Sequence, residues 1–213
     1  MSADRHLSYE QFQDDCQTLV TISDELGESW RLCRSDSVTW LELQQLRTLE
    51  TDDDEVMVQC LYQVHYSVSY AVPVLLCRFS HMSGEMIDYE TVRRRILSHG
   101  VTTDTGDLTP GVTTDMVSMA PHPVTGLPWL QVHPCKTADT LMTLQSHRNN
   151  NDDNDDNSDD SDGLLDQDKC NTVISFLSFY GQALGLHMNP RFATTKVNSH
   201  AALRTVTCDC YQS

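Results

Sequence analysis

A cysteine in a His-Pro-Cys turn is the first chemistry that the sequence offers. Cys135 follows His133 and Pro134, and the apolar run from Leu127 to Val132 leads into the turn. Proline fixes its own φ and biases the preceding residue toward extended geometry, so we expect the sulfur to be held at the end of a strand, facing solvent. Lys136 favours the thiolate, the nucleophilic form of cysteine. The alternative is a buried structural cysteine, because free cysteine is among the most often buried residue types.

The residues around this cysteine resemble a known active-site segment. The stretch from His122 to Thr137 reads His-Pro-Val-Thr-Gly-Leu-Pro-Trp-Leu-Gln-Val-His-Pro-Cys-Lys-Thr, and a Tyr-Ser-Val-Ser-Tyr stretch (66–70) and Val-Pro-Val-Leu (72–75) precede it. This pattern closely resembles the autophagy-related protein ten family, whose members are ubiquitin-like conjugating enzymes. The resemblance extends through residues 62–79 upstream and 171–190 downstream.

The resemblance implies a fold, a reaction and partners. The fold is α+β and like that of ubiquitin-conjugating enzymes, an antiparallel sheet flanked by an N-terminal and a C-terminal helix, with the catalytic cysteine at the end of a strand. Such an enzyme accepts a ubiquitin-like modifier as a thioester on its cysteine, here Cys135, and passes it to a lysine. The implied modifier is autophagy protein twelve, the activating enzyme autophagy protein seven and the acceptor autophagy protein five, recognised without a separate ligase. The resemblance implies a reaction without a cofactor or a metal ion.

The residues beside Cys135 suggest how the reaction is supported. In ordinary ubiquitin-conjugating enzymes a His-Pro-Asn motif precedes the cysteine, whereas here the cysteine directly follows His133 and Pro134, so that asparagine is absent. We expect backbone N–H groups after Cys135, together with the Thr137 hydroxyl, to take part of its role at the oxyanion. We expect His133 to be structural, because an imidazole held in a proline turn usually donates to the backbone.

Composition limits the other classes of function. At 213 residues the chain is long enough for one domain spanning 1–213. The net charge of −17, to which residues 149–162 contribute seven aspartates, argues against nucleic-acid binding and for a basic partner surface. We expect no signal peptide and no membrane span. Eight cysteines without a CxxC pair indicate reduced thiols in a cytoplasmic protein. We expect a monomer, with Cys208 and Cys210 in a polar tail rather than in a metal site.

The first half of the chain predicts a helix followed by strands. Ser8 to Leu26 has apolar residues at three- and four-residue steps, with Ser8 as N-cap and Gly27 as the stop. Within residues 28–55, only 38–43 predict a strand, and it is short. The segment looks shorter than the corresponding segment in the family, so the presence of the first strand pair of the fold is not assured by the sequence. Residues 56–79 alternate between apolar and polar side chains, typical of a half-buried antiparallel sheet, with a turn or bulge near 71–73. His65 falls on the polar face of this alternation.

The second half predicts two helices separated by loops. A helix over 88–98 carries Arg93 to Arg95, which form either a solvated face or a contact with an acidic partner. Residues 101–121 predict a loop with a turn of helix near 114–119, and 138–144 a short helix or loop. The acidic stretch 149–162 is expected to be a disordered insertion. A second helix begins at Asn171 or Thr172 and ends at Gly185; regular structure ends at 189–190, and residues 191–213 are expected to form a loose tail.

Three alternatives remain open at this point. A cysteine peptidase needs a histidine base, for which the candidates are His65, His81, His122 and His147. A non-catalytic binding module on a degenerate conjugating-enzyme fold is compatible with the shortened 28–55 segment. A zinc site would use His122, His133, Cys135 and His147, although these ligands are not in close-spaced pairs.

Overall fold

The computed structural model describes residues 7–35, 38–50, 55–97, 116–135, 137–138, 141 and 171–195. Residues 98–115, the acidic stretch 149–162, Lys136 and residues 196–213 lie outside the described residues, so the expectations for them are not tested. No helix that the structure describes is long and apolar enough to span a bilayer.

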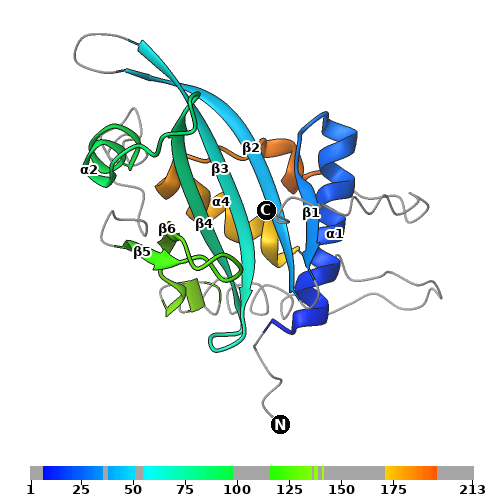
Figure 1. The fold of residues 1–213 in the computed structure, drawn as a ribbon. Helices are drawn as coiled ribbons and strands as arrows, with labels where there is room; N and C mark the ends of the chain where they lie inside the picture. The colour runs from blue at the N-terminus through cyan, green and yellow to red at the C-terminus, as the bar shows by residue number, and fades with distance from the viewer. Residues whose placement is uncertain are drawn as a thin grey trace, which may run out of the picture.

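One antiparallel sheet of six strands organises the described chain (Figure 1). Its strands are β1 (Arg31–Ser35), β2 (Val38–Glu50), β3 (Glu55–Ser67), β4 (Val72–His81), β5 (Val117–Pro121) and β6 (Pro128–Val132), in the spatial order β1-β2-β3-β4-β6-β5. The first four strands form three antiparallel pairs between neighbours in the chain, so this part of the sheet is built from consecutive hairpins. Only β6 breaks the order, because it inserts between β4 and β5.

The helices cover one face of this sheet and complete the main core. α1 (Tyr9–Leu26) and α4 (Thr172–Tyr180) pack together, and α4 continues into the 3₁₀ turn η4 (Gly181–Leu184). Figure 1 shows α4 behind the sheet and α1 beside it at the β1 edge. The fully buried side chains Phe12, Tyr62, Phe79, Phe176 and Tyr180 belong to this core. The expected α+β architecture is therefore confirmed.

Both predicted helix starts are confirmed by their caps. The Ser8 hydroxyl accepts the backbone N–H of Gln11, and Gly27 ends α1 with a φ of 70°, a left-handed conformation that favours glycine. Asn171 caps α4 by accepting from the N–H of Ile174. Asp15 of α1 joins the two helices, because its carboxylate accepts the N–H of Thr172 at 2.8 Å and its backbone carbonyl accepts the Asn171 side chain at 2.7 Å.

The strand predicted within residues 28–55 was too short. This segment carries the first strand pair, β1 and β2, and β2 continues to Glu50 in register with β3, from Leu41 opposite Val64 to Glu50 opposite Glu55. The strand extends through polar residues such as Gln44 because its partner β3 supplies the hydrogen bonds, and side chains on the outer face remain in water.

The predicted turn between β3 and β4 is confirmed. Residues 68–71 form it, and Ala71 has a φ of 52°, which is strained for a residue with a side chain. Pro73 pairs with Tyr66 of β3, but β6 pairs with β4 only at Leu76 and Cys77. Proline is tolerated here because no strand needs its missing N–H on the other side.

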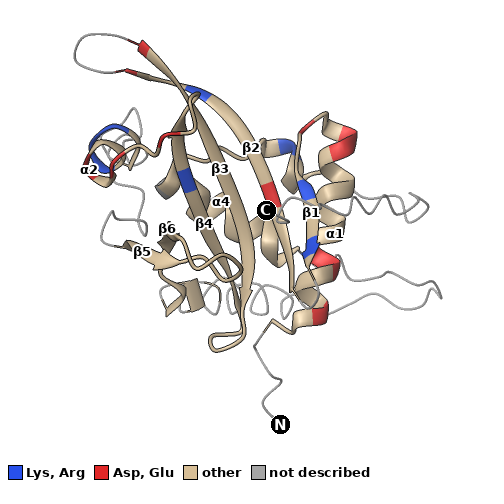
Figure 2. Ribbon diagram, viewed as in Figure 1, with Lys and Arg blue, Asp and Glu red and all other residues tan. Residues whose placement is uncertain are grey.

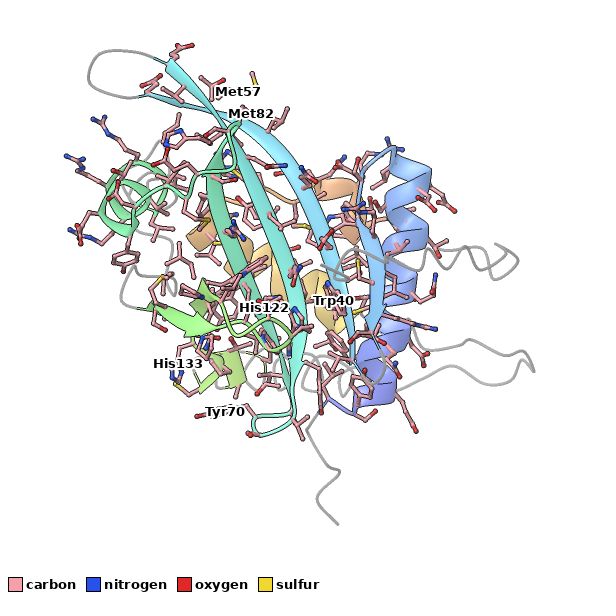
Figure 3. The ribbon with its side chains drawn as sticks, viewed as in Figure 1. Trp40, Met57, Tyr70, Met82, His122 and His133 are labelled. Atoms are coloured by element: carbon pink, nitrogen blue, oxygen red, sulfur yellow. The ribbon has the colours of Figure 1, made fainter. Side chains whose placement is uncertain are left out.

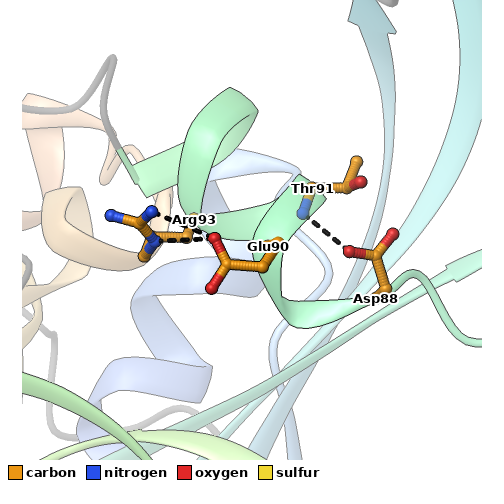
Figure 4. Close-up of polar contacts among 4 residues, drawn as sticks. All are labelled: Asp88, Glu90, Thr91 and Arg93. Carbon is orange, nitrogen blue, oxygen red and sulfur yellow. Dashed lines mark hydrogen bonds and ion pairs between the residues drawn. The ribbon is translucent and has the colours of Figure 1, made fainter.

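The helix expected over 88–98 is confirmed in position but changes type halfway. Asp88 caps α2 (Tyr89–Val92) by accepting from the N–H of Thr91 at 2.9 Å, and Glu90 pairs with Arg93 at 3.0 Å (Figure 4). From Arg93 the chain continues as a π-helical turn, η1 (Arg93–Leu97). Single π turns of this kind occur frequently at functional sites.

Two segments expected to be irregular are regular in the structure. Residues 117–119, expected near a turn of helix, belong to β5, since they pair with β6 from Val117 opposite Val132. After Asn189, residues 190–193 form the 3₁₀ turn η5 (Pro190–Ala193), whose Phe192 is buried against the core. β5 forms because it pairs with β6, which its local propensity does not encode, whereas η5 begins at a local cap, since the Asn189 side chain accepts the N–H of Arg191.

Candidate active site

Cys135 differs from the other cysteines that the structure describes. It is half-exposed, whereas Cys16, Cys33, Cys60 and Cys77 are buried. Burial raises the pKa of the Cys60 thiol to about 11 and raises the pKa of Cys16 and of Cys77 well above the ordinary value. These buried thiols are therefore held neutral and are unreactive. Among the described cysteines, only Cys135 combines access to solvent with a polar neighbour.

The end of β6 and a following helical turn place this cysteine. β6 ends at Val132, and the N–H of His133 donates to the carbonyl of Met116 at 2.9 Å, which extends the pairing with the neighbouring strand. Pro134 is buried and takes the first helical position, where its missing N–H is not needed. Cys135 follows in the same helical turn, so the sulfur stands three residues beyond the strand rather than at its end.

His133 contacts both the backbone and the sulfur of Cys135. Its Nδ1 accepts the N–H of Cys135 at 3.3 Å, as an N-cap side chain does, and lies 2.7 Å from Sγ. The expectation that this imidazole donates to the backbone was wrong, because Nδ1 accepts. An acceptor nitrogen at this distance is positioned to receive the thiol proton, which would leave a thiolate beside an imidazolium.

Tyr70 is the neighbour of this pair that sequence reasoning missed. Its ring stands edge-on to the His133 ring, with centroids 6.4 Å apart, and it comes from the turn between β3 and β4 (Figure 3). The contact places the Tyr70 ring next to the imidazole that lies at the sulfur. No local pattern marks Tyr70 for this role, because the partners lie in separate hairpins.

The remaining residues expected near the sulfur are less exposed. Thr137 is fully buried, and its hydroxyl oxygen has no hydrogen-bond partner among the described residues. Its expected part at the oxyanion stays a prediction.

His65 and His122 lie together on the sheet and not at Cys135, and His81 lies at the end of β4. Within the described part of the chain, no three His, Cys, Asp or Glu residues are grouped as metal ligands, and His147 lies outside it.

A buried polar network holds the connection between β5 and β6 against the sheet. This connection crosses the face opposite α4 (Figure 1), where His122 meets Gln63 and His65 of β3. Gln63 Nε2 donates to Glu42 at 2.8 Å, so the amide oxygen of Gln63 faces the histidines and accepts from Nε2 of His65 at 2.8 Å and of His122 at 2.6 Å. Each histidine is therefore protonated on Nε2.

The same network holds the loop and the strand that lead to Cys135. Nδ1 of His122 accepts the N–H groups of Val124 and Thr125, which shapes the loop. The centroid of its ring lies 4.7 Å from that of the Trp129 ring in β6. Since Cys135 follows β6, the network positions the strand that carries it. His65 was expected on a solvated polar face, but it is only 3% exposed because the loop covers it.

The network predicts a loss of stability in acid. Burial, together with the neighbouring His122, lowers the pKa of His65 to about 3, and burial lowers the pKa of His122 to about 4. The unfolded chain thus binds more protons below pH ~6.5, and the stabilisation present above that pH is lost as the pH falls toward the folded values. We expect the free energy of unfolding at pH 5 to fall by about 2 kcal/mol for each histidine relative to pH 8.

Urea unfolding measured between pH 8 and pH 5 tests this. His122→Gln is expected to reduce the dependence on pH by about half, while His187→Gln, at an exposed position, is the matched control and leaves it unchanged. Equal slopes for the two variants would show that the buried pair does not cause the acid sensitivity.

Thr137 gives a second test of the site. Because its hydroxyl is buried without a described partner, Thr137→Val is expected to raise the free energy of unfolding by about 1 kcal/mol. Thermal unfolding measures this change, with Thr194→Val at an exposed position as control. Activity of the same variant tests the oxyanion role, since an undiminished transfer rate would remove the side chain from the mechanism.

Comparison with known proteins identifies the family. Residues 11–191 match the family described as autophagocytosis associated protein, active-site domain. This match includes α1, the whole sheet, Cys135 and α4. Comparison with curated proteins found no match. The chain belongs to the autophagocytosis-associated family of ubiquitin-like conjugating enzymes.

Proposed function

We propose that Cys135 carries a ubiquitin-like modifier as a thioester and transfers it to a lysine of an acceptor protein. The observation that supports this most is the contact between the half-exposed sulfur and Nδ1 of His133, at 2.7 Å, inside the region that matches the family's active-site domain. The segment from His122 to Thr137 resembles the active-site segment of autophagy protein ten. We therefore propose autophagy protein twelve as modifier, autophagy protein seven as activating enzyme and autophagy protein five as acceptor, in a cytoplasmic reaction.

The first step loads the cysteine. His133 Nδ1 takes the thiol proton, and Sγ attacks the carbonyl carbon of the modifier's C-terminal glycine, which arrives as a thioester on the activating enzyme. The new S–C bond forms as the old one breaks, and the thiolate of the activating enzyme leaves. Backbone N–H groups after Cys135 are the proposed donors to the oxyanion, because no asparagine occupies the usual place.

The second step transfers the modifier. The uncharged amine of the acceptor lysine attacks the thioester carbonyl, the N–C bond forms, and Cys135 leaves as a thiolate beside the protonated His133. The excess proton of the amine passes to solvent. Tyr70, which keeps the imidazole at the sulfur in both steps, acts as a positioning residue.

The loading reaction distinguishes this proposal from a peptidase. Incubation of the protein with activating enzyme, ATP and modifier should produce an adduct that dithiothreitol removes. Rapid release of free modifier, without an adduct, would support hydrolysis instead. The structure favours transfer over hydrolysis, because no described residue hydrogen-bonds Nε2 of His133, whereas cysteine peptidases usually orient the base with a third residue.

A further inference from the structure

The turn between β3 and β4 exposes apolar side chains to solvent. It consists of residues 68–71, and we call it the active-site turn. Val68 is 83% exposed, the highest value among the large hydrophobic side chains that the structure describes, and Tyr70 is 41% exposed. Turns are usually rich in glycine, proline and small polar residues. A single exposed apolar residue is ordinary, but two of them in one turn next to a reactive cysteine indicate a binding surface.

The backbone of the active-site turn is well defined. Ser67 and Val72 lie opposite each other in the ladder between β3 and β4, so this pair closes the turn. Ala71 has a φ of 52°, in the left-handed region that glycine adopts at lower cost. The turn therefore presents Val68 and Tyr70 from the end of a closed hairpin, and a partner that binds them has little ordering entropy to overcome.

Tyr70 places the active-site turn next to the sulfur. Its ring centroid lies 6.4 Å from that of His133, and Nδ1 of His133 lies 2.7 Å from Sγ of Cys135. Figure 3 shows Tyr70 and His133 at the same end of the sheet. Only the imidazole separates the Tyr70 ring from Sγ. Because an extended peptide advances about 3.3 Å per residue, about three residues cover the path from Sγ to this ring.

The chemistry at Cys135 indicates which partner passes the turn. In the function proposed above, the C-terminal glycine of the modifier is bonded to Sγ, whereas the acceptor brings only a lysine side chain, and only in the second step. The residues directly before the glycine must therefore leave Sγ along the surface around it. About three to five extended residues are enough to bring one of them to Tyr70 or to Val68, two positions further along the turn.

The lack of charge around the turn indicates what kind of residue binds there. No residue from Tyr66 to Leu76 is charged, although the chain has a net charge of −17. Figure 2 shows this turn free of acidic and basic residues, whereas both kinds occur near the other end of β2 and β3. A charged side chain of the modifier would find no ion-pair partner in this segment, whereas an apolar one would remove Val68 and Tyr70 from water.

We propose that the active-site turn binds the C-terminal tail of the modifier. An apolar side chain of the tail, about three to five residues before the terminal glycine, packs on Val68 and Tyr70. This inference rests on the function proposed for Cys135 and adds to it a determinant of specificity for the modifier.

Single-turnover transfer from preloaded activating enzyme to the full chain tests this inference. Val68→Ser is expected to load about fivefold more slowly than wild type, because the transition state loses an apolar contact. Val68→Leu keeps apolar surface and should load within about twofold of wild type. Met82→Ser is the control, because Met82 is also exposed but lies at the far end of β4 (Figure 3), and it should load at the wild-type rate.

A double-mutant cycle identifies the partner of Val68. Serine is placed in turn at each of the five residues before the terminal glycine of the modifier. At the position that packs on the turn, this change should slow loading of wild type about fivefold but loading of Val68→Ser less than about twofold. Any effect of the tail on the activating enzyme is the same for both proteins and cancels in the cycle.

The outcomes separate the two proposals. Equal effects of every tail substitution on wild type and Val68→Ser would show that the turn does not contact the tail. Normal loading of Val68→Ser with slow transfer to the acceptor would place the acceptor at the turn instead, and would also overturn the inference. If wild type forms no adduct that dithiothreitol removes, the function proposed for Cys135 fails, and the inference fails with it. Urea unfolding of Val68→Ser checks that its fold is intact, as expected for a side chain outside the core.

Discussion

Cys135→Ser is expected to trap the modifier. Given activating enzyme, ATP and modifier, this variant should accumulate an adduct that survives dithiothreitol, while formation of the acceptor conjugate falls by at least about 1,000-fold, or about 4 kcal/mol in the barrier. The reason is that serine forms an oxyester, whose alkoxide is a much poorer leaving group than a thiolate. Gel electrophoresis with and without reductant measures both quantities.

The environment of Cys135 indicates that the serine substitution changes the chemistry without changing the fold. Cys135 is half-exposed, and the serine hydroxyl can keep the contact with His133, so the fold should be unchanged. Cys135→Ala is the matched control and should form no adduct. A reducible adduct on either variant would place the thioester on another cysteine, and an undiminished conjugate would exclude covalent transfer through residue 135.

His133→Ala is expected to have the second largest effect, a fall of about 100-fold in the rate of loading at neutral pH. Alanine removes both the acceptor at Sγ and the cap on the Cys135 N–H, which should also lower the free energy of unfolding by about 1 kcal/mol. Single-turnover loading and urea unfolding measure the two effects.

His133→Asn separates these roles. Asparagine caps helix N-termini well but cannot take a proton, so it should restore stability while loading stays about tenfold slow at neutral pH. The rate should recover toward alkaline pH, because hydroxide then replaces the imidazole as the base. Wild-type loading by the asparagine variant at neutral pH would assign His133 a capping role alone.

Features that depend on neighbours in the sequence were predictable. The caps at Ser8, Gly27 and Asn171 act within a few residues, and the structure has all three. The alternation of residues 56–79 correctly predicted β3 and β4, because alternation reflects which side of a strand faces the core, and Pro73 marked the region of the turn between them. The α+β class followed from these elements. The proposal that Cys135 is the nucleophile also rests on its neighbours in the sequence.

Features that depend on residues distant in the sequence were not predictable. β2 and β5 were mispredicted because pairing with β3 and β6 stabilises them against weak local propensity. The alternation of β3 put His65 on a solvated face, but it carried no information that the loop after β5 covers that face.

The sequence by itself indicated Cys135 as the proposed nucleophile, the α+β class and the positions of α1, β3, β4 and α4. The tertiary structure alone decided what surrounds Cys135: the Nδ1 of His133 directed at Sγ, and the ring of Tyr70 from another hairpin. It also decided the pairing of two histidines on Gln63, and the hydrogen bond from Arg47 to the carbonyl of Gly185, 138 residues away. The physical reason is that caps and periodicity arise from interactions within a few residues, whereas a site forms only when folding brings separate segments into contact.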